Sequence, residues 1–489
     1  MILTIQPEIT YQTIHGFGAS DAWSIQFVGK HWPLEKRERI ADLLFSTKFD
    51  DDGNPQGIGL SVWRFNIGAG SARQGEDSGI RDPWRRAESF LLDNGTYDWT
   101  KQAGQQWFMH AAKERGAEQF IGFVNSPPIA LTKNGMAYGD GSGGSNLPKE
   151  KYDDFAEYLV TLNEHFAQSG IPFDYLSPVN EPQWNWSLEN GQEGCPWQNP
   201  EFAKMQQVLD SAIVESGQDV KIEIPETARL DFIYNGDLDG RNSQAQYFFG
   251  KNSRVKNLPS LAKKVAAHSY FTTWPTDSLI HHRREVRKSL AAIDPDLEYW
   301  MSEYCILADN EEIRGNGRDL GMDPALYIAR VIHADLTIAN AASWQWWLAV
   351  SPYEYKDGLV YIDKDTSDGK VYESKLLWTL GNYSRFIRPG AVRIGVERSD
   401  NAQPEEYMRS GILASAYLNE GGGEAIVVIV NNSEEPREVQ LNFAGYNASI
   451  HLTPYVTSAE SDLERGAAIS SGEIVGIPPR SVVTFIGTL

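Results

Sequence analysis

The 489-residue sequence has few cysteines and no long hydrophobic run, and each absence excludes a class of protein. Cys195 and Cys305 are the only two cysteines, too few for a disulfide-stapled scaffold and without the paired spacing of a zinc site. No window approaches the ~20 consecutive apolar residues of a membrane-spanning helix, so we expect no membrane insertion. The first residues also lack a basic segment followed by an apolar one, so no signal peptide is visible.

Positive charge is also scarce. The chain has 44 Lys plus Arg against 66 Asp plus Glu, which gives a formal net charge of −22. An acidic surface of this kind repels phosphate backbones, so nucleic acid is not an expected partner. The balance of 41% hydrophobic and 22% charged residues is that of a folded globular chain.

Aromatic residues, by contrast, are abundant, with 15 Trp, 21 Tyr and 20 Phe. Several lie near glycine, asparagine and carboxylate residues. Aromatic faces pack in protein cores and equally suit the apolar faces of sugar rings. Any single tryptophan is by default a packing residue.

Most of the chain alternates between short β-rich runs and long amphipathic stretches, a pattern that predicts a parallel sheet covered by crossover helices. Eight such strand and helix units predict a (β/α)8 TIM barrel over residues 13–388. An open, doubly wound sheet is the structural alternative. The predicted strands are 13–19, 60–67, 119–125, 175–180, 221–225, 264–270, 298–303 and 342–347.

The pattern changes at Arg388-Pro389-Gly390, where the helical periodicity stops. Beyond it, alternating runs such as 412–418 and 424–430 predict a small antiparallel β-sandwich over residues 389–489. The N-terminal segment also alternates. We therefore assign residues 1–12 to the same side domain.

Two predicted strands end in glutamate, and in a TIM barrel the functional residues lie at these strand ends. Glu181 follows the fourth strand in Asn180-Glu181-Pro182, and Glu303 ends the seventh. Two carboxylates facing each other across a barrel mouth suit glycosidic cleavage, because one protonates the leaving oxygen while the other attacks the anomeric carbon or activates water. A single glutamate there is more often an ion-pair partner, but the matched pair favours catalysis.

These motifs resemble glycoside hydrolase family 30, a group of retaining enzymes with Asn-Glu-Pro on strand four. The resemblance covers nearly the whole chain and includes the side sandwich. Besides Asn180-Glu181-Pro182, it rests on Gly16-Phe17-Gly18, Arg64-Phe65-Asn66-Ile67-Gly68, Asn125-Ser126-Pro127-Pro128, His268-Ser269-Tyr270 and Ser302-Glu303-Tyr304.

The resemblance implies that Glu181 is the general acid/base and Glu303 the nucleophile, at the ~5–5.5 Å separation of a retaining pair. Asn180 is then expected to bind the sugar 2-hydroxyl, Arg64 to keep Glu303 ionised, and Tyr270 to donate to the same carboxylate. The resemblance makes His268 a further candidate for substrate binding.

Each of these supporting residues also has a purely structural interpretation. Asn180 suits a turn before proline, Arg64 a structural ion pair, and both His268 and Tyr270 suit buried polar groups with satisfied hydrogen bonds.

Tryptophans are candidates for the floor and walls of the substrate site. Trp344 and Trp346 share one face of the last barrel strand and Trp347 lies on the other. We predict that the first two face the site, with Trp346 aligned best to the family's platform aromatic. The loop after the fourth strand adds Trp184, Trp186 and Trp197 for the far side of the cleft, although loop tryptophans also cap barrels.

Several polar residues stay open at this point. Cys195 and Cys305 both fall in loops at the expected barrel mouth, so a disulfide is conceivable, although free buried thiols are favoured. Asp21, Glu226 and Asp309 lie near strand ends, where solvent contact or ion pairing is the simpler interpretation.

The sequence thus predicts a retaining β-glycoside hydrolase that needs no metal and no organic cofactor. An endo-β-1,6-galactanase is favoured, ahead of β-1,6-glucanase, β-xylanase and glucosylceramidase-like activities. A catalytically silent carbohydrate-binding barrel is the alternative from another class. An oxidoreductase on an open sheet is disfavoured, because the glycine-rich segment 139–144 lies too far from the preceding strand. The resemblance implies a monomer that acts on polysaccharide or oligosaccharide in the periplasm or outside the cell.

Overall fold

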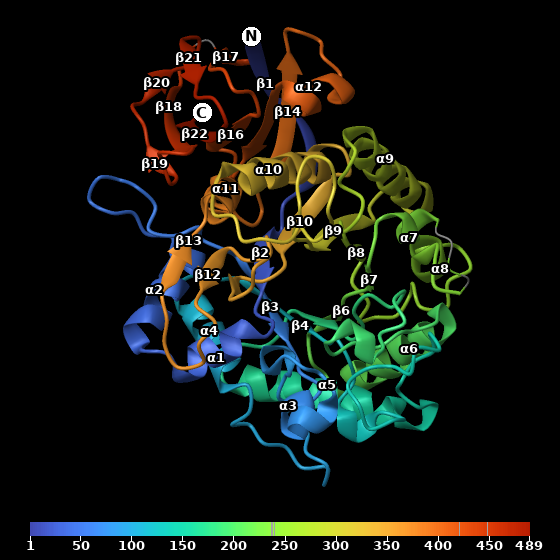
Figure 1. Cartoon of the computed structure of the whole chain (residues 1–489). Coiled ribbons are helices and arrows are strands. Elements are labelled where there is room, and N and C mark those ends of the chain that lie inside the picture. Colours follow the sequence, from blue (N-terminus) through green and yellow to red (C-terminus); the bar gives the residue numbers. More distant parts are fainter. Residues whose placement is uncertain (236–237, 239, 420, 447) are drawn as a thin grey trace.

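The computed structural model describes residues 1–235, 238, 240–419, 421–446 and 448–489. Its largest part is a parallel sheet curled into a ring with helices around it (Figure 1). The barrel strands are β2 (Gly16–Ser20), β3 (Val62–Asn66), β4 (Gln119–Phe123), β5 (Tyr175–Ser177), β6 (Lys221–Ile222), β7 (Pro225–Thr227), β8 (Lys264–His268), β9 (Glu298–Glu303) and β10 (Ala341–Trp346).

Helices follow the barrel strands, apart from β6, which leads directly into β7, and they cover the outside of the ring. They are α1 (Ser24–His31), α2 (Leu34–Phe45), α3 (Ser71–Gln74), α4 (Ala103–Glu114), α5 (Tyr152–Gln168), α6 (Asn199–Ser216), α7 (Asp231–Tyr234), α8 (Gln244–Phe249), α9 (Thr276–Ile293), α10 (Met322–Thr337) and α11 (Lys375–Ser384). The strand–helix alternation that the sequence predicted is confirmed.

The ring closes through an interrupted fifth strand. The sheet runs in the order β6-β5-β4-β3-β2-β10-β9-β8-β7, and its two ends, β6 and β7, are separated only by Glu223 and Ile224. The Glu223 N–H donates to Leu176 of β5 at 2.9 Å, and the Ile224 carbonyl accepts from Ala266 of β8 at 2.9 Å. One stretch of chain therefore bonds to both neighbours, which confirms the barrel. The open doubly wound sheet is wrong, because such a sheet has two free edges.

The second unit is a mostly antiparallel sheet folded over its own core, which confirms the predicted sandwich. N-terminal strand β1 pairs antiparallel with β14 and parallel with β17, so the two ends of the chain meet in this unit (Figure 1). The strands are β1 (Ile2–Thr13), β14 (Val392–Arg398), β15 (Ile412–Leu418), β16 (Glu424–Asn431), β17 (Arg437–Phe443), β18 (His451–Thr457), β19 (Glu464–Arg465), β20 (Ile469–Ser470), β21 (Ile474–Ile477) and β22 (Ser481–Thr488), with helix α12 (Pro404–Ser410) after β14.

Helix α11 joins the barrel to the sandwich through buried hydrogen bonds. The Asn382 amide donates to the Tyr455 carbonyl at 3.1 Å and to the Thr484 hydroxyl oxygen at 3.0 Å. The Thr484 hydroxyl donates back to the Asn382 carbonyl at 2.7 Å. Because Asn382 and Thr484 are fully buried, the two units share a packed polar contact.

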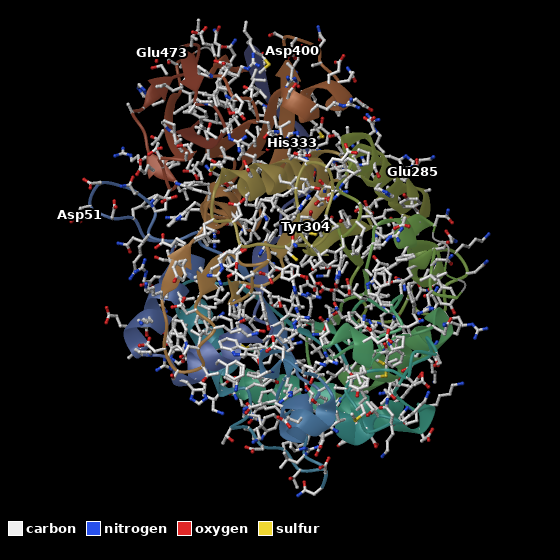
Figure 2. The ribbon with its side chains drawn as sticks, viewed as in Figure 1. Asp51, Glu285, Tyr304, His333, Asp400 and Glu473 are labelled. Carbon is white, nitrogen blue, oxygen red and sulfur yellow. The ribbon has the colours of Figure 1, made fainter. Side chains whose placement is uncertain are left out.

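The surface carries the acidic excess. Asp51, Asp400 and Glu473 are exposed and lie at the edge of the molecule in Figure 2, whereas Tyr304 and His333 lie inside it.

None of the described helices is long and apolar enough to cross a membrane. After β10, the chain adds a small sheet of β11 (Val350–Ser351), β12 (Val360–Ile362) and β13 (Val371–Glu373).

Candidate active site

A cavity of about 400 Å³ opens among the loops that follow the barrel strands, and its lining includes both predicted catalytic glutamates. Glu303 is the last residue of β9, and Glu181 lies four residues beyond the end of β5. The parallel strands aim their carboxyl ends at the same mouth, which brings residues far apart in sequence together. One carboxylate oxygen of each glutamate and one nitrogen of His268 all lie within 4.8 Å of one another.

The backbone at Glu181 is held in an unusual conformation. Its φ of 44° lies in the left-handed region, which residues other than glycine seldom adopt. Its N–H donates to the Glu226 carbonyl at 3.0 Å, and its carbonyl accepts from the Trp186 indole at 2.9 Å. These two bonds fix the direction in which the Glu181 side chain enters the cavity.

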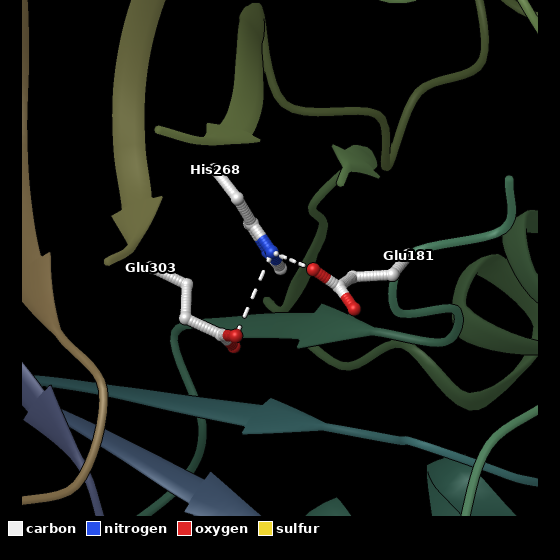
Figure 3. Close-up of side chains that lie close together, drawn as sticks. All are labelled: Glu181, His268 and Glu303. Atoms are coloured by element: carbon white, nitrogen blue, oxygen red, sulfur yellow. Dashed lines mark hydrogen bonds and ion pairs between the residues drawn. The ribbon is translucent and has the colours of Figure 1, made fainter. Parts of the chain in front are cut away.

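His268, the last residue of β8, lies between the carboxylates (Figure 3). Its Nδ1 is 2.9 Å from a Glu181 oxygen and 3.6 Å from a Glu303 oxygen, and its Nε2 is 2.9 Å from a Glu226 oxygen. Burial alone would lower the pKa of His268, but Glu303, Glu181 and Glu226 outweigh it and raise the pKa to about 10. The ring is therefore a cation at neutral pH.

Arg64 of β3 is the second buried cation at the site. Its guanidinium ion-pairs with Glu303, donates to the Asn180 side-chain oxygen at 3.0 Å, and lies 3.3 Å from Glu226. The Tyr270 hydroxyl donates to the other Glu303 oxygen at 3.0 Å. The structure thus brings Arg64, Asn180, His268 and Tyr270 together around the two glutamates, as the sequence placed them.

The three carboxylates of this cluster are in different electrostatic situations. Arg64 and His268 supply two positive charges, enough to balance two of the three. Despite its burial, Glu226 has its pKa lowered far below the usual range by Arg64 and His268. Burial raises the pKa of Glu181, and the Glu303 charge adds to this against the opposing effect of His268. Glu181 is therefore suited to carry a proton when Glu303 is ionised.

Glu226 is a site residue for which the sequence favoured solvent contact or an ion pair over contact with a substrate hydroxyl. It lies in β7, fully buried, and accepts from the Ser302 hydroxyl at 2.6 Å in addition to its contacts with Arg64 and His268. Glu226 thus forms ion pairs with both buried cations of the site, Arg64 and His268. The only sequence signal was its position at the end of the interrupted fifth strand.

The last barrel strand differs from the prediction. Trp344 and Trp346 are fully buried and neither belongs to the cavity lining. The Trp344 indole donates to Asp335 of α10 at 3.0 Å, so it faces the helix layer, and the Trp346 indole donates to the Asp357 carbonyl at 2.7 Å. It is Trp347, on the opposite face, that lines the cavity. Alternation along a strand separates two faces but does not identify the inward one.

The loop after β5 does reach the cavity. Trp184 and Trp186 line it, and Trp184 lies edge to face with Phe271 at 6.3 Å. Trp197 is instead packed against Tyr152 at 5.9 Å, below the mouth.

The two cysteines and the aspartates near the strand ends lie outside the catalytic cluster. Cys195 and Cys305 are both buried and free, so they form no disulfide. Asp21 is fully buried and accepts from the Asn66 N–H at 2.7 Å, whereas Asp309 caps the Gly315 N–H at 2.9 Å. Neither aspartate lines the cavity.

Glu181, His268 and Glu303 lie close enough together to suggest a metal site. Both ring nitrogens of His268 already have partners, because Nδ1 and Nε2 each lie 2.9 Å from a carboxylate oxygen, of Glu181 and of Glu226 respectively. The geometry is that of a hydrogen-bonded network between a histidine and carboxylates.

Comparison with known proteins agrees with this geometry. Residues 1–361 match O-glycosyl hydrolase family 30, and residues 390–485 match the glycosyl hydrolase family 30 beta sandwich domain. An endo-beta-1,6-galactanase of Hypocrea rufa is 26% identical over 405 residues, covering 79% of this chain and 75% of that protein. The lysosomal acid glucosylceramidase of Mus musculus is 23% identical over 462 residues, covering 89% and 78%.

A solved structure of a conserved exported protein from Bacteroides fragilis is 37% identical, with a TM-score of 0.93 over 99% of this chain and 100% of that one. The family matches span both the barrel and the sandwich, and the paired glutamates lie at the barrel mouth where the sequence placed them. The chain therefore belongs to O-glycosyl hydrolase family 30 and is a glycoside hydrolase with a carbohydrate substrate.

Proposed function

We propose that this protein is a retaining β-glycosidase that cleaves β-1,6-linked galactan by double displacement. The observation that carries the proposal is the close approach of Glu181 and Glu303 in opposite electrostatic settings. A separation within 4.8 Å between their oxygens leaves no room for a water molecule between nucleophile and sugar, as an inverting mechanism requires.

In the first step, Glu303 attacks the anomeric carbon while Glu181 donates its proton to the leaving oxygen. The carbon–oxygen bond to the leaving sugar breaks, and a covalent glycosyl-Glu303 ester forms. Neutralising the Glu303 charge removes the main partner of Arg64, which retains Glu226 and the Asn180 oxygen. The Asn180 amide donates one hydrogen to the Asn125 side-chain oxygen at 3.1 Å, and we assign its second hydrogen to the sugar 2-hydroxyl.

In the second step, Glu181, now an anion, accepts a proton from water while the water oxygen attacks the same carbon. The ester breaks, Glu303 is released as a carboxylate, and the sugar keeps its β configuration. His268 stabilises Glu181 in its charged state between the two steps, since its Nδ1 is 2.9 Å away.

The choice of galactan is supported by the Hypocrea rufa relative, whose name gives endo-beta-1,6-galactanase activity. The cleft carries aromatic side chains on both sides, Trp23 and Trp347 on one and Trp184 and Phe271 on the other, which favours a chain substrate and endo action.

The test is the product profile of the purified protein on β-1,6-galactan, β-1,6-glucan, xylan and a glucosylceramide, with Glu303→Gln as the inactive control. Short β-1,6-galacto-oligosaccharides from the wild type alone would support the proposal, and β-configured products observed by NMR would support retention. Turnover of another polymer would contradict the proposed galactan substrate but would leave the proposed retaining mechanism intact. Binding without turnover on all four would favour the silent carbohydrate-binding barrel.

We further propose that the protein is a monomer that acts outside the cytoplasm, with the barrel spanning residues 13–388. The related protein from Bacteroides fragilis is described as exported. Light scattering of the purified protein and cell fractionation of the native host would test oligomeric state and location, and limited proteolysis would test the domain limits.

A further inference from the structure

Asp357 is a buried carboxylate in the wall of the active-site cavity that the mechanism above does not use. It lies between β11 and β12, is 7% exposed, and lines the same cavity as Glu181 and Glu303. Within the described part of the chain, its Oδ1 makes no hydrogen bond. A buried acceptor without a partner is costly, so its retention beside a cavity calls for a ligand that donates to it.

The loop around Asp357 is fixed by hydrogen bonds that do not involve its carboxylate. Its carbonyl accepts from the Trp346 indole at 2.7 Å. The Gly358 N–H donates to the Tyr361 hydroxyl at 3.2 Å, and that hydroxyl donates to the Tyr355 carbonyl at 2.8 Å. These bonds fix the backbone that carries Asp357, and a hydrogen bond from the Ser351 side chain orients the carboxylate itself.

The neighbours of Asp357 are of the kind that recognise sugars. Trp23 and Trp347 line the same cavity with their rings edge to face at 5.3 Å, offering apolar faces. The Arg85 guanidinium lies 4.9 Å from the Trp23 ring centre. Burial raises the pKa of Asp357 to about 6, with Ser351, Arg85 and Arg318 opposing it, so the group is an anion at neutral pH. An ionised carboxylate is acceptor-only and binds adjacent hydroxyls with both oxygens.

The position of Asp357 decides which sugar it meets. The leaving sugar departs toward the acid, Glu181, whose loop carries Trp184 and Trp186. Asp357, Trp23 and Trp347 come from loops after β2 and β10, on the other side of the nucleophile strand β9. This side therefore holds the sugar that becomes bonded to Glu303.

We propose that Asp357 is a specificity-determining residue that accepts hydrogen bonds from the 3- and 4-hydroxyls of the sugar ring attacked by Glu303. This inference rests on the proposed function of Glu181 and Glu303. Within a β-1,6-linked chain the 6-oxygen of the attacked sugar is already glycosylated, so with Asn180 at the 2-hydroxyl the 3- and 4-hydroxyls are the ring donors left for the Asp357 carboxylate that lines the same cavity. The 4-hydroxyl is axial in galactose and equatorial in glucose, so the fixed position of Asp357 discriminates between the two configurations.

The test combines a protein change with a substrate change. Asp357→Asn and wild type are compared on 4-nitrophenyl β-galactoside and on its 3-deoxy and 4-deoxy analogues. We expect kcat/KM of the variant to fall about 10- to 100-fold on the parent, the size of a hydrogen bond to a charged group. On an analogue that lacks the bonded hydroxyl, kcat/KM of Asp357→Asn should be less than about 3-fold below that of the wild type, because the hydrogen bond is absent from both. Glu354→Gln, in the same loop with its side chain 76% exposed, is the matched control and should match the wild type.

Equal losses on parent and deoxy substrates, or no loss on the parent, would overturn the inference. Thermal unfolding of each variant detects misfolding, and if Asp357→Asn does not fold, Asp357→Ser repeats the comparison. If the polysaccharide panel selects another sugar, the same series is made in that configuration. Failure of the galactan proposal and failure of the Asp357 proposal therefore give different results.

Discussion

At the scale of single residues, two glutamates with identical side chains take different roles because the charged groups around them differ. Glu303 forms an ion pair with Arg64 and accepts a hydrogen bond from the Tyr270 hydroxyl. Glu181 is buried beside that same negative charge, and its pKa rises. The roles proposed for the two glutamates follow from their neighbours, because the side chains themselves are chemically alike.

The acid role of Glu181 predicts a dependence on the leaving group. Glu181→Ala should lower kcat/KM on a natural oligosaccharide by about 10²- to 10⁴-fold, because general acid catalysis is lost. On 2,4-dinitrophenyl β-galactoside, whose leaving group needs no proton, glycosylation should be nearly unaffected, as pre-steady-state bursts would reveal. An equal loss in the glycosylation rate of both substrates would contradict the assignment.

Asp21 predicts a pH effect on stability that is independent of catalysis. Burial raises its pKa to about 8 against the hydrogen bonds from Asn66 and Gln105, whereas the unfolded value is 3.8. Because the folded pKa exceeds the unfolded value, the protonated Asp21 side chain contributes to the free energy of unfolding. This contribution is fully present below about pH 4 and is lost as the pH rises to about 8. Asp21→Asn removes this titration, so its melting temperature relative to wild type should rise steadily between pH 4 and 8. A difference that stays constant over this range would show that Asp21 does not titrate there.

The sequence was informative about residues that sit in motifs at strand ends. Glu181 and Glu303 were predicted because they stand just after the fourth and at the end of the seventh predicted strand, and the structure brings them together. Asp357 was missed, because Lys356-Asp357-Gly358 reads as an ordinary polar turn and nothing local indicates burial. The network under Glu226 was only partly foreseen, since its partners Arg64, His268 and Ser302 come from three other strands.

At the scale of elements, β10 shows the limit of a period-two pattern. The sequence separates Trp344 and Trp346 from Trp347 correctly but assigns the wrong face to the cavity. The pairing of β10 with β9 carries a register shift between Ala341 and Ser343, which no periodicity predicts. Similarly, the fifth strand was predicted as one run, and the structure divides it into β6 and β7.

This face assignment predicts opposite effects for two tryptophans three positions apart. Trp344→Phe deletes the donor to buried Asp335 and should lower the free energy of unfolding by about 1–3 kcal/mol while kcat/KM is unchanged. Trp347→Phe keeps an aromatic ring of smaller area in the cavity wall, and should lower kcat/KM about 3- to 10-fold with a smaller loss of stability. Urea unfolding and oligosaccharide kinetics on both variants check this. A larger kinetic defect in Trp344→Phe would restore the original interpretation of the strand.

At the scale of the whole molecule, the sandwich is bonded to the barrel through α11 and is not a loosely tethered attachment. Asn382 donates to two buried acceptors across the junction, the Tyr455 carbonyl and the Thr484 hydroxyl. The two units are therefore expected to unfold together.

Asn382→Leu tests the junction, because it removes the buried amide that donates to both acceptors. We expect the free energy of unfolding to fall by about 2–4 kcal/mol. Calorimetry should resolve a second transition if the two units separate. A single transition at the wild-type temperature would mean that the junction contributes little to cooperativity.

The pairing of β1 with both β14 and β17 has a consequence for biosynthesis. Residues 2–13 leave the ribosome before the barrel is made, but their two neighbouring strands, at residues 392–398 and 437–443, emerge only after it. Throughout that interval β1 has two unpaired edges. The pairing of β1 is therefore complete only once the strands that follow the barrel have been translated.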